Sequence, residues 1–187
     1  MGKGLTAADL LPAERVLASK LANLWVKPSE HGLMELSLGA HLGTAEALGG
    51  RAYLTTYRVL FRPHRFNRLV TAHSLLLPNV VRVRRGWFGV GVDSRAQVFD
   101  LVMWFNRGFV DALEDARRGL GRAGAGRLRE VIRAHPDRLG SLLPRSTLAA
   151  VEAVVAGALE AGEVVGDLPA RDRAAFAEVV ALFAADG

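Results

Sequence analysis

The sequence predicts an α+β fold in which a strand-rich middle is flanked by helices. Between Leu33 and Trp104 apolar and polar residues alternate in short runs, which is typical of strands with one buried face. On either side of this block, apolar residues recur at helical spacing instead. The 187 residues are half apolar and include no cysteine, so a core can form without disulfides. We therefore expect a compact antiparallel barrel or sandwich of six or seven strands with helices around it.

The first element expected is a helix over residues 6–26. Thr6 and Asp9 have the spacing of a capping box at its start, and Pro28 favours its end because proline disfavours a helical conformation in the residue before it. Most apolar residues of this stretch fit one helical stripe, namely Leu10, Leu11, Val16, Leu17, Leu21, Leu24 and Trp25.

Short strands are expected to follow. Alternation predicts strands at 34–38, 57–62 and 80–84, and the apolar run 75–77 leads into a turn at Pro78-Asn79. Gly49-Gly50 is interpreted as a tight turn into a strand at 51–55, because glycine accepts the positive φ that such turns need. Residues 89–92 and 97–104 are expected to form a hairpin that turns at 93–95.

The helical period returns at Phe105. Residues 105–118 are predicted to form a helix that closes one end of the sheet, with an apolar face made of Phe105, Phe109, Ala112, Leu113 and Ala116. Residues 119–126 are interpreted as a glycine-rich linker. They match a dinucleotide fingerprint only formally, because a helix rather than a strand precedes them. Helices at 127–134, 146–161 and 170–185 would then form a helical appendage. The chain is thus divided into an N-terminal helix and linker (1–32), a barrel with its capping helix (33–118), and a linker with appendage (119–187).

The basic residues gather in the middle of the chain. Residues 51–95 hold nine arginines and one acidic residue, Asp93, whereas residues 120–187 hold eight basic and nine acidic residues. The formal net charge of the whole chain is only +5. The local excess indicates either a strand domain with an arginine-rich solvent face or a site for anions.

A resemblance to a known family rests on residues 49–67, GGRAYLTTYRVLFRPHRFN. This stretch resembles the glycine-turn hairpin motif of the GRAM family, of the bacterial type, a branch of the pleckstrin-homology-like (PH-like) superfold. Residues 76–83 are similar to a second family segment, with Asn79 where an acid is common, and residues 98–117 resemble its last strand and closing helix. The resemblance covers about residues 33–118. It implies a strongly bent sheet of seven strands capped by a C-terminal helix, usually a non-catalytic binding module for membrane lipids or protein partners, and it carries over no ligand residue.

Anion binding is the chemistry that the residues themselves favour. Basic residues form two groups, a first one at 62–68 and a second one at 82–85. Arginine forks bind phosphate with two parallel hydrogen bonds, so one cationic patch would form if both groups face the open end of the barrel. Trp87 and Phe88 follow the second group after Gly86, and there the rings could lie at a membrane interface while the cations reach headgroups. The candidate anion-binding residues are Arg62, His64, Arg65, Arg68, Arg82, Arg84 and Arg85. Alternatively, Trp87 and Phe88 cover the core or dock against the appendage.

No catalytic, metal or cofactor motif is recognisable. The five histidines are scattered, no Gly-x-Ser-x-Gly occurs, and cysteine chemistry is excluded. We therefore expect a binding module without enzyme activity, cofactor or metal, in the cytoplasm or peripheral on a membrane, since neither a secretory signal nor an apolar span is visible. The expected partner is an anionic lipid or membrane surface. The alternative is a scaffold whose helices bind a protein or a second copy, while nucleic acid is not expected because no stacking motif or helix-turn-helix occurs.

Overall fold

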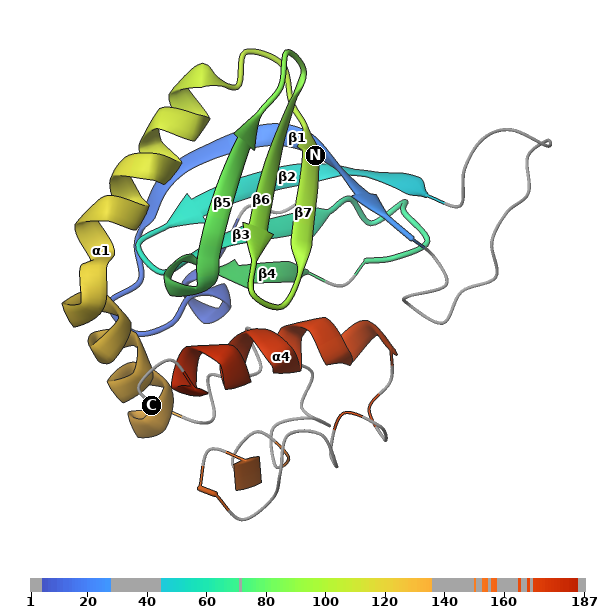
Figure 1. Ribbon diagram of the computed structural model, residues 1–187. Helices are drawn as coiled ribbons and strands as arrows, with labels where there is room; N and C mark the ends of the chain where they lie inside the picture. Colours follow the sequence, from blue (N-terminus) through green and yellow to red (C-terminus); the bar gives the residue numbers. More distant parts are fainter. Residues whose placement is uncertain are drawn as a thin grey trace.

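Seven strands form one antiparallel sheet in the order β4-β3-β2-β1-β7-β6-β5. The computed structural model describes residues 5–27, 45–70, 72–135 and 170–184, with 150, 153, 154, 156, 157, 165 and 168. In chain order the elements are η1 (Ala7–Asp9), β1 (Val16–Val26), β2 (Glu46–Thr55), β3 (Arg58–Pro63), β4 (His73–Leu76), η3 (Leu77–Asn79), β5 (Val80–Arg85), β6 (Gly89–Ser94), β7 (Val98–Val102), α1 (Arg107–Ala134) and α4 (Ala170–Ala184). The sheet is strongly bent, so that β5 to β7 run across the direction of β2 to β4 (Figure 1).

The α+β class and the strand-rich middle are confirmed. Strands β3, β5, β6 and β7 occupy residues predicted as strands, and residues 77–79 form the predicted turn as a single turn of 3-10 helix. The first half of α1 closes the sheet as expected, because Phe109, Val110 and Leu113 are buried in the same core as the inward faces of the strands. The predicted strand at 34–38 lies outside the described residues.

The predicted N-terminal helix is wrong. Residues 16–26 form strand β1, which pairs with β2 along its length and with β7 near its end. Ala22, Leu24 and Val26 are buried, whereas Leu21 and Trp25 on the opposite face are exposed. Because both faces of β1 carry apolar residues, polar and apolar residues do not alternate along its sequence as they do in a strand with one buried face. The spacing of the apolar residues therefore resembled that of an amphipathic helix. Only the single turn η1 remains of the helix, and there the Asp9 carboxylate accepts hydrogen bonds from the N–H and the hydroxyl of Thr6.

The predicted turn at Gly49-Gly50 is also wrong, since both glycines lie inside β2. A Cβ on Gly50 would stand 2.4 Å from the carbonyl oxygen of Arg62 and 2.7 Å from the ring of Phe61. Glycine is therefore needed here for close approach of the neighbouring strand and its side chain, and not for a positive φ.

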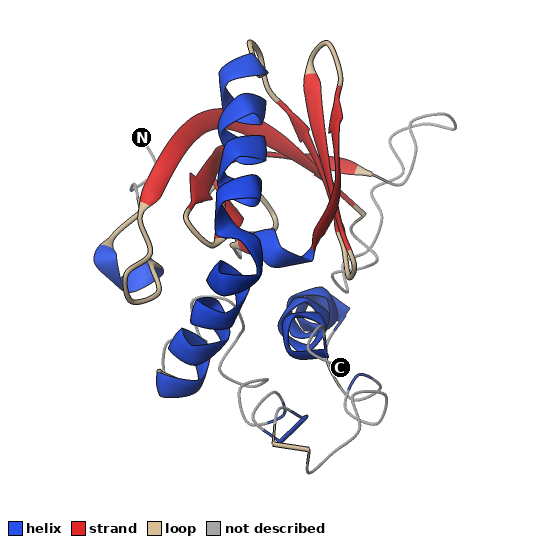
Figure 2. Ribbon diagram, turned by 60° about the vertical axis from the view of Figure 1, so that its left-hand side comes forward, coloured by secondary structure: helices blue, strands red, loops and turns tan. Residues whose placement is uncertain are grey.

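The predicted glycine linker is part of a helix. Residues 119–126 lie in the middle of α1, which runs from Arg107 to Ala134 and changes direction partway along (Figure 2). Gly121 interrupts the helix with φ 51° and ψ −169°, a conformation that only glycine adopts readily. Leu128 and Ile132 on the second half are buried, so tertiary packing holds the glycine-rich stretch in a helix.

Helix α4 lies beneath the sheet, as Figure 1 shows, and packs on the second half of α1. Phe176, Val179 and Leu182 are buried in a second core with Leu128 and Ile132 of α1. The prediction of a helix at 170–185 is therefore confirmed, whereas the predicted helix at 146–161 lies mostly outside the described residues. Within the described part of the chain, no helix is long and apolar enough to cross a bilayer.

A carboxylate fastens α4 to the sheet. Glu178 is 2% exposed and accepts hydrogen bonds from the N–H of Leu76 and the amide of Asn79, at 3.2 and 2.9 Å, and from the Ser94 hydroxyl. Burial raises the pKa of Glu178 above its ordinary value, although these hydrogen bonds oppose the increase.

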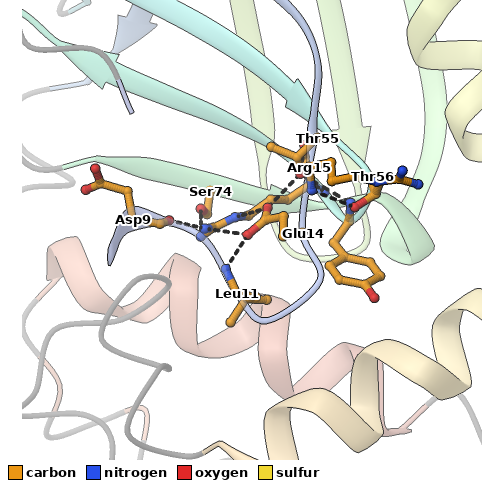
Figure 3. Close-up of polar contacts among 9 residues, drawn as sticks. Asp9, Leu11, Glu14, Arg15, Thr55, Thr56 and Ser74 are labelled. Atoms are coloured by element: carbon orange, nitrogen blue, oxygen red, sulfur yellow. Dashed lines mark hydrogen bonds and ion pairs between the residues drawn. The ribbon is translucent and has the colours of Figure 1, made fainter. Parts of the chain in front are cut away.

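A buried ion pair joins the N-terminal segment to the sheet (Figure 3). The guanidinium of Arg58 on β3 donates to both carboxylate oxygens of Glu14, at 2.8 and 3.0 Å. It also donates to the Ser74 hydroxyl and to the carbonyl oxygen of Asp9, while the Thr55 hydroxyl donates to Glu14. One of the nine arginines in the basic middle of the chain is thus a structural group inside the fold.

Candidate functional site

Four large aromatic side chains gather at the end of the sheet where α1 begins. They come from two connections, β5 to β6 and β7 to α1, and we call them the aromatic tip: Trp87, Phe88, Trp104 and Phe105. Their exposed fractions are 92%, 54%, 65% and 88%. The rings of Phe88 and Trp104 meet edge to face with centroids 4.8 Å apart, so the two connections are in contact. The alternative interpretation, in which Trp87 and Phe88 cover the core or dock against the appendage, does not fit their exposure of 92% and 54%.

Hydrogen bonds hold the two connections together beneath the rings. The N–H of Met103 donates to the carbonyl oxygen of Phe88 at 2.9 Å. The side-chain amide of Asn106, which is 6% exposed, donates to the carbonyl oxygens of Gly86 and Gly89 at 3.0 and 2.9 Å. Asn106 stands at the start of α1 but caps the β5–β6 turn instead of the helix. The tip is therefore built on a fixed base.

Phe105 points away from the core because of its backbone. Its φ of 51° is in the left-handed region, which costs a residue with a side chain about 1–3 kcal/mol. The ammonium group of Lys20 donates to the carbonyl oxygen of Phe105 and so stabilises this geometry. The prediction that Phe105 belongs to the apolar face of the helix is wrong, since α1 begins two residues later.

Cations surround the tip, and several of them already have carboxylate partners. Arg84 pairs with Asp93 and Asp100, and the hydrogen bonds that it donates to Asp93 are the main cause that raises the pKa of Arg84. Arg85 pairs with Asp111. Strands β1, β5, β6 and β7 together with residues 107–111 of α1 carry five cations and three carboxylates, which leaves a modest positive excess: Lys20, Arg82, Arg84, Arg85 and Arg107 against Asp93, Asp100 and Asp111.

A shallow groove of about 270 Å³ lies beside the tip on the outer face of the sheet. Arg84 and Arg85 line it together with Trp25 and Asp100. The guanidinium of Arg84 lies flat across Gly91, where a Cβ would stand 2.6 Å from its central carbon. Arg84 is thus held on the sheet surface, whereas the side chain of Arg107 is 88% exposed and makes only a long ion pair with Asp111, at 3.9 Å.

The first predicted basic group lies on and after β3. Arg62 pairs with Asp9 at 3.0 Å and Arg68 with Glu46 at 2.6 Å. Burial raises the pKa of Asp9, but its hydrogen bonds from Thr6 and the charge of Arg62 outweigh this and lower it overall. The Arg65 guanidinium lies over the ring of Phe66 at 4.8 Å from its centroid. The backbone N–H of His64 donates to the carbonyl oxygen of Gly49 on β2.

The structure does not bring the two predicted basic groups together in the sheet. Strands β2, β1, β7 and β6 lie between β3 and β5. Each group pairs with different carboxylates, and only Arg82, Arg84 and Arg85 lie on the strand that leads into the tip. The described residues also contain no group of three or more metal-ligating side chains.

Two of the four tip residues, Trp87 and Phe88, were predicted from the sequence as contact candidates. Trp104 was instead predicted to lie in a strand and Phe105 in a helix. A signal was present, since the dipeptide Trp-Phe occurs twice, at 87–88 and at 104–105, next to a strand end each time. Asn106 and Lys20, which support the tip, have no sequence signal because their partners are distant in the chain.

Known proteins with a similar structure are found, but none with a matching sequence. No family model and no curated protein matches the sequence. Among solved structures the chain is similar to the Vps36 N-terminal PH domain, with 12% identity and a TM-score of 0.43, over 64% of this chain and 93% of that one. It is also similar to the C-terminal domain of an unknown protein from Leishmania infantum, with 14% identity and a TM-score of 0.40, over 57% and 86% of the two chains.

Proposed function

We propose that the protein is a non-catalytic binding module that associates reversibly with anionic membrane surfaces through the aromatic tip. The observation that carries this proposal is the convergence of two Trp-Phe pairs into one exposed cluster, 17 positions apart in the chain and in ring contact. An exposed apolar patch of this kind marks an interaction site. The resemblance to the GRAM family, whose members usually bind lipids or proteins, supports a binding module but does not choose between these two ligands.

The chemistry of the tip suits the interface of a bilayer. Indole and phenyl rings are favoured at headgroup depth, and each basic residue near an anionic surface contributes about 1 kcal/mol. Because several arginines around the tip are already paired with carboxylates, the rings supply most of the attraction in this proposal. Lys20, Arg82 and Arg107 supply the preference for anionic lipid. Such binding is reversible, as a few side chains do not anchor a protein permanently.

Vesicle co-sedimentation of the full chain tests the proposal. We expect the protein to pellet with vesicles that contain phosphatidylserine and to pellet less with pure phosphatidylcholine. Trp87→Ser combined with Phe105→Ser removes the two most exposed rings of the tip and is expected to weaken binding by about tenfold or more, which corresponds to about 1.4 kcal/mol. Both side chains are exposed, so the variant retains its fold.

Phe66→Ser is the matched control, because Phe66 is an equally exposed aromatic residue, at 85%, outside the tip. We expect this variant to bind vesicles as the wild type does. Failure of the wild type to pellet with either vesicle would overturn the proposal, and so would an equal loss of binding in the Phe66 variant. Capture of a protein partner that depends on Trp87 and Phe105, without vesicle binding, would point to a protein surface instead.

The alternative function, a scaffold whose helices bind a protein or a second copy of the chain, has less support from the described helices. The apolar face of α4, with Phe176, Val179 and Leu182, is buried against α1 and the end of the sheet within the same chain. That face is therefore not available for a partner or a second copy. Protein binding through the helices accordingly stays the weaker alternative.

A further inference from the structure

A second cavity lies far from the aromatic tip, between the middle of α1, the turn η3 and the end of α4. Its volume is about 460 Å³, within the range of pockets that hold small molecules. Leu77, Val80, Leu120 and Leu182 form its apolar lining. The cavity is therefore large enough for a small organic ion and not only for solvent.

Four arginines line this cavity, and none of its described lining residues is acidic: Arg95, Arg117, Arg122 and Arg129. Arg129 donates to the carbonyl oxygen of Leu182 at 3.1 Å, and Arg117 donates to that of Val81 at 3.3 Å. Arg117 also pairs with Glu114 at 3.8 Å, so part of its charge is already balanced. Two of the four guanidinium groups are thus placed by backbone carbonyl oxygens.

Arg95 and Arg122 are exposed and make no ion pair with any residue that the structure describes. The N–H of Arg95 donates to the carbonyl oxygen of Asn79, which holds this residue beside η3. The charges of Arg95 and Arg122 are not balanced by any carboxylate that the structure describes, so an anion that enters the cavity is attracted by both. Arginine binds phosphoryl oxygens with two parallel hydrogen bonds, which makes phosphate the best match.

The interruption of α1 lies at this cavity. Gly121 is one of its lining residues, and the second half of the helix begins directly after it. The helix is therefore interrupted, at a glycine with φ 51° and ψ −169°, at the same place where the arginine-lined cavity lies.

We infer that this cavity binds a soluble ligand with two or more phosphoryl groups. Its position separates it from the proposed membrane surface. Gly121 lies 14 residues after the start of α1 at Arg107, which at about 1.5 Å per residue is roughly 21 Å along the helix from the tip. Headgroups of a membrane that holds the tip are therefore out of reach, and the ligand comes from solution.

Titration calorimetry of the full chain with tripolyphosphate tests the inference. We expect binding that is stronger than binding of inorganic phosphate and that weakens with added salt. Arg95→Gln combined with Arg122→Gln removes the two arginines without ion pairs and is expected to lower the affinity by about tenfold or more. Arg127→Gln is the matched control, since Arg127 is exposed on the same helix and does not line the cavity.

The outcomes are distinguishable from those of the proposed function. The Trp87→Ser, Phe105→Ser variant should bind tripolyphosphate as the wild type does, and the Arg95→Gln, Arg122→Gln variant should still pellet with anionic vesicles. Absence of tripolyphosphate binding in the wild type would overturn the inference. An equal loss of affinity in the Arg127 variant would overturn it too, because it would show attraction to net charge alone. Loss of vesicle binding in the Arg95, Arg122 variant would instead assign the arginines to a lipid headgroup.

Discussion

Arg58 and Glu14 form an ion pair from which solvent is shut out. The Nε atom of Arg58 lies 2.8 Å from Oε1 of Glu14, and both side chains are 0% exposed. The pair connects β3 to the segment before β1, 44 positions away in the chain. An arginine that looks in sequence like one more cation of a basic surface is therefore part of the interior.

Removal of one partner of this pair is expected to destabilise the fold strongly. Arg58→Met or Glu14→Gln leaves the other group buried without its counter-charge, which costs about 3–5 kcal/mol of the free energy of unfolding. The double variant Arg58→Met, Glu14→Leu should lose less than the sum of the two single losses, because no unpaired charge remains. Urea unfolding measures all three. Arg118→Met, which breaks an exposed pair with Asp115, serves as the control and should change stability by less than about 1 kcal/mol.

Asn106 is expected to control the shape of the aromatic tip. Asn106→Ala removes two hydrogen bonds to the carbonyl oxygens of Gly86 and Gly89 and should cost about 1–3 kcal/mol. Because those bonds fix the connection that carries Trp87 and Phe88, the tryptophan fluorescence of the folded variant should also change. A stability loss with unaltered fluorescence would contradict a positioning role for Asn106.

Two glycines are expected to respond to alanine in opposite directions. Gly50→Ala places a Cβ 2.4 Å from the Arg62 carbonyl oxygen, a backbone atom that cannot swing aside, so a loss of several kcal/mol is expected. Gly119→Ala meets no atom within 4 Å in a helical segment and should stabilise the protein by about 0.5–1 kcal/mol. Thermal unfolding of both variants checks the contrast. Equal effects would show that Gly50 is not needed for close strand approach.

The pH dependence of stability should carry a contribution from Glu178. Its pKa is raised in the folded protein by burial, above an ordinary value of 4.5. A raised folded pKa means that the native state binds the proton more tightly than the unfolded state. The stabilisation is therefore fully present below about pH 4.5 and is lost as the pH rises through the raised value.

Glu178→Gln removes this titration and keeps an acceptor for the N–H of Leu76 and the amide of Asn79. Urea unfolding of both proteins between acidic and neutral pH tests the expectation. The stability of the variant relative to the wild type should increase with pH. A constant difference across the range would show that Glu178 keeps an ordinary pKa in the folded state.

Local patterns were sufficient for the strands whose two faces differ. In β7 buried and exposed residues alternate along the strand, and the hairpin of β6 and β7 was predicted, although its turn lies at 95–97 and not at 93–95, since Asp93 and Ser94 belong to β6. Such elements depend on side chains within a few positions. The α+β class, the antiparallel middle and the first half of α1 could therefore be predicted, and so could the exposed pair Trp87-Phe88 as a candidate contact site.

Other features were decided only by contacts between distant segments. Apolar residues on both faces of 16–26 leave helix and strand equally plausible, and pairing with β2 and β7 selects the strand. The glycine-rich stretch around Gly121 becomes helical because Leu128 and Ile132 beyond it find a partner surface on α4. The sequence shows how many basic residues the middle of the chain has, but not which carboxylates they pair with. Charge and aromatic content are properties of the sequence, whereas which cation meets a carboxylate, and which ring meets another ring, is determined by how strands and connections far apart in the chain pack together.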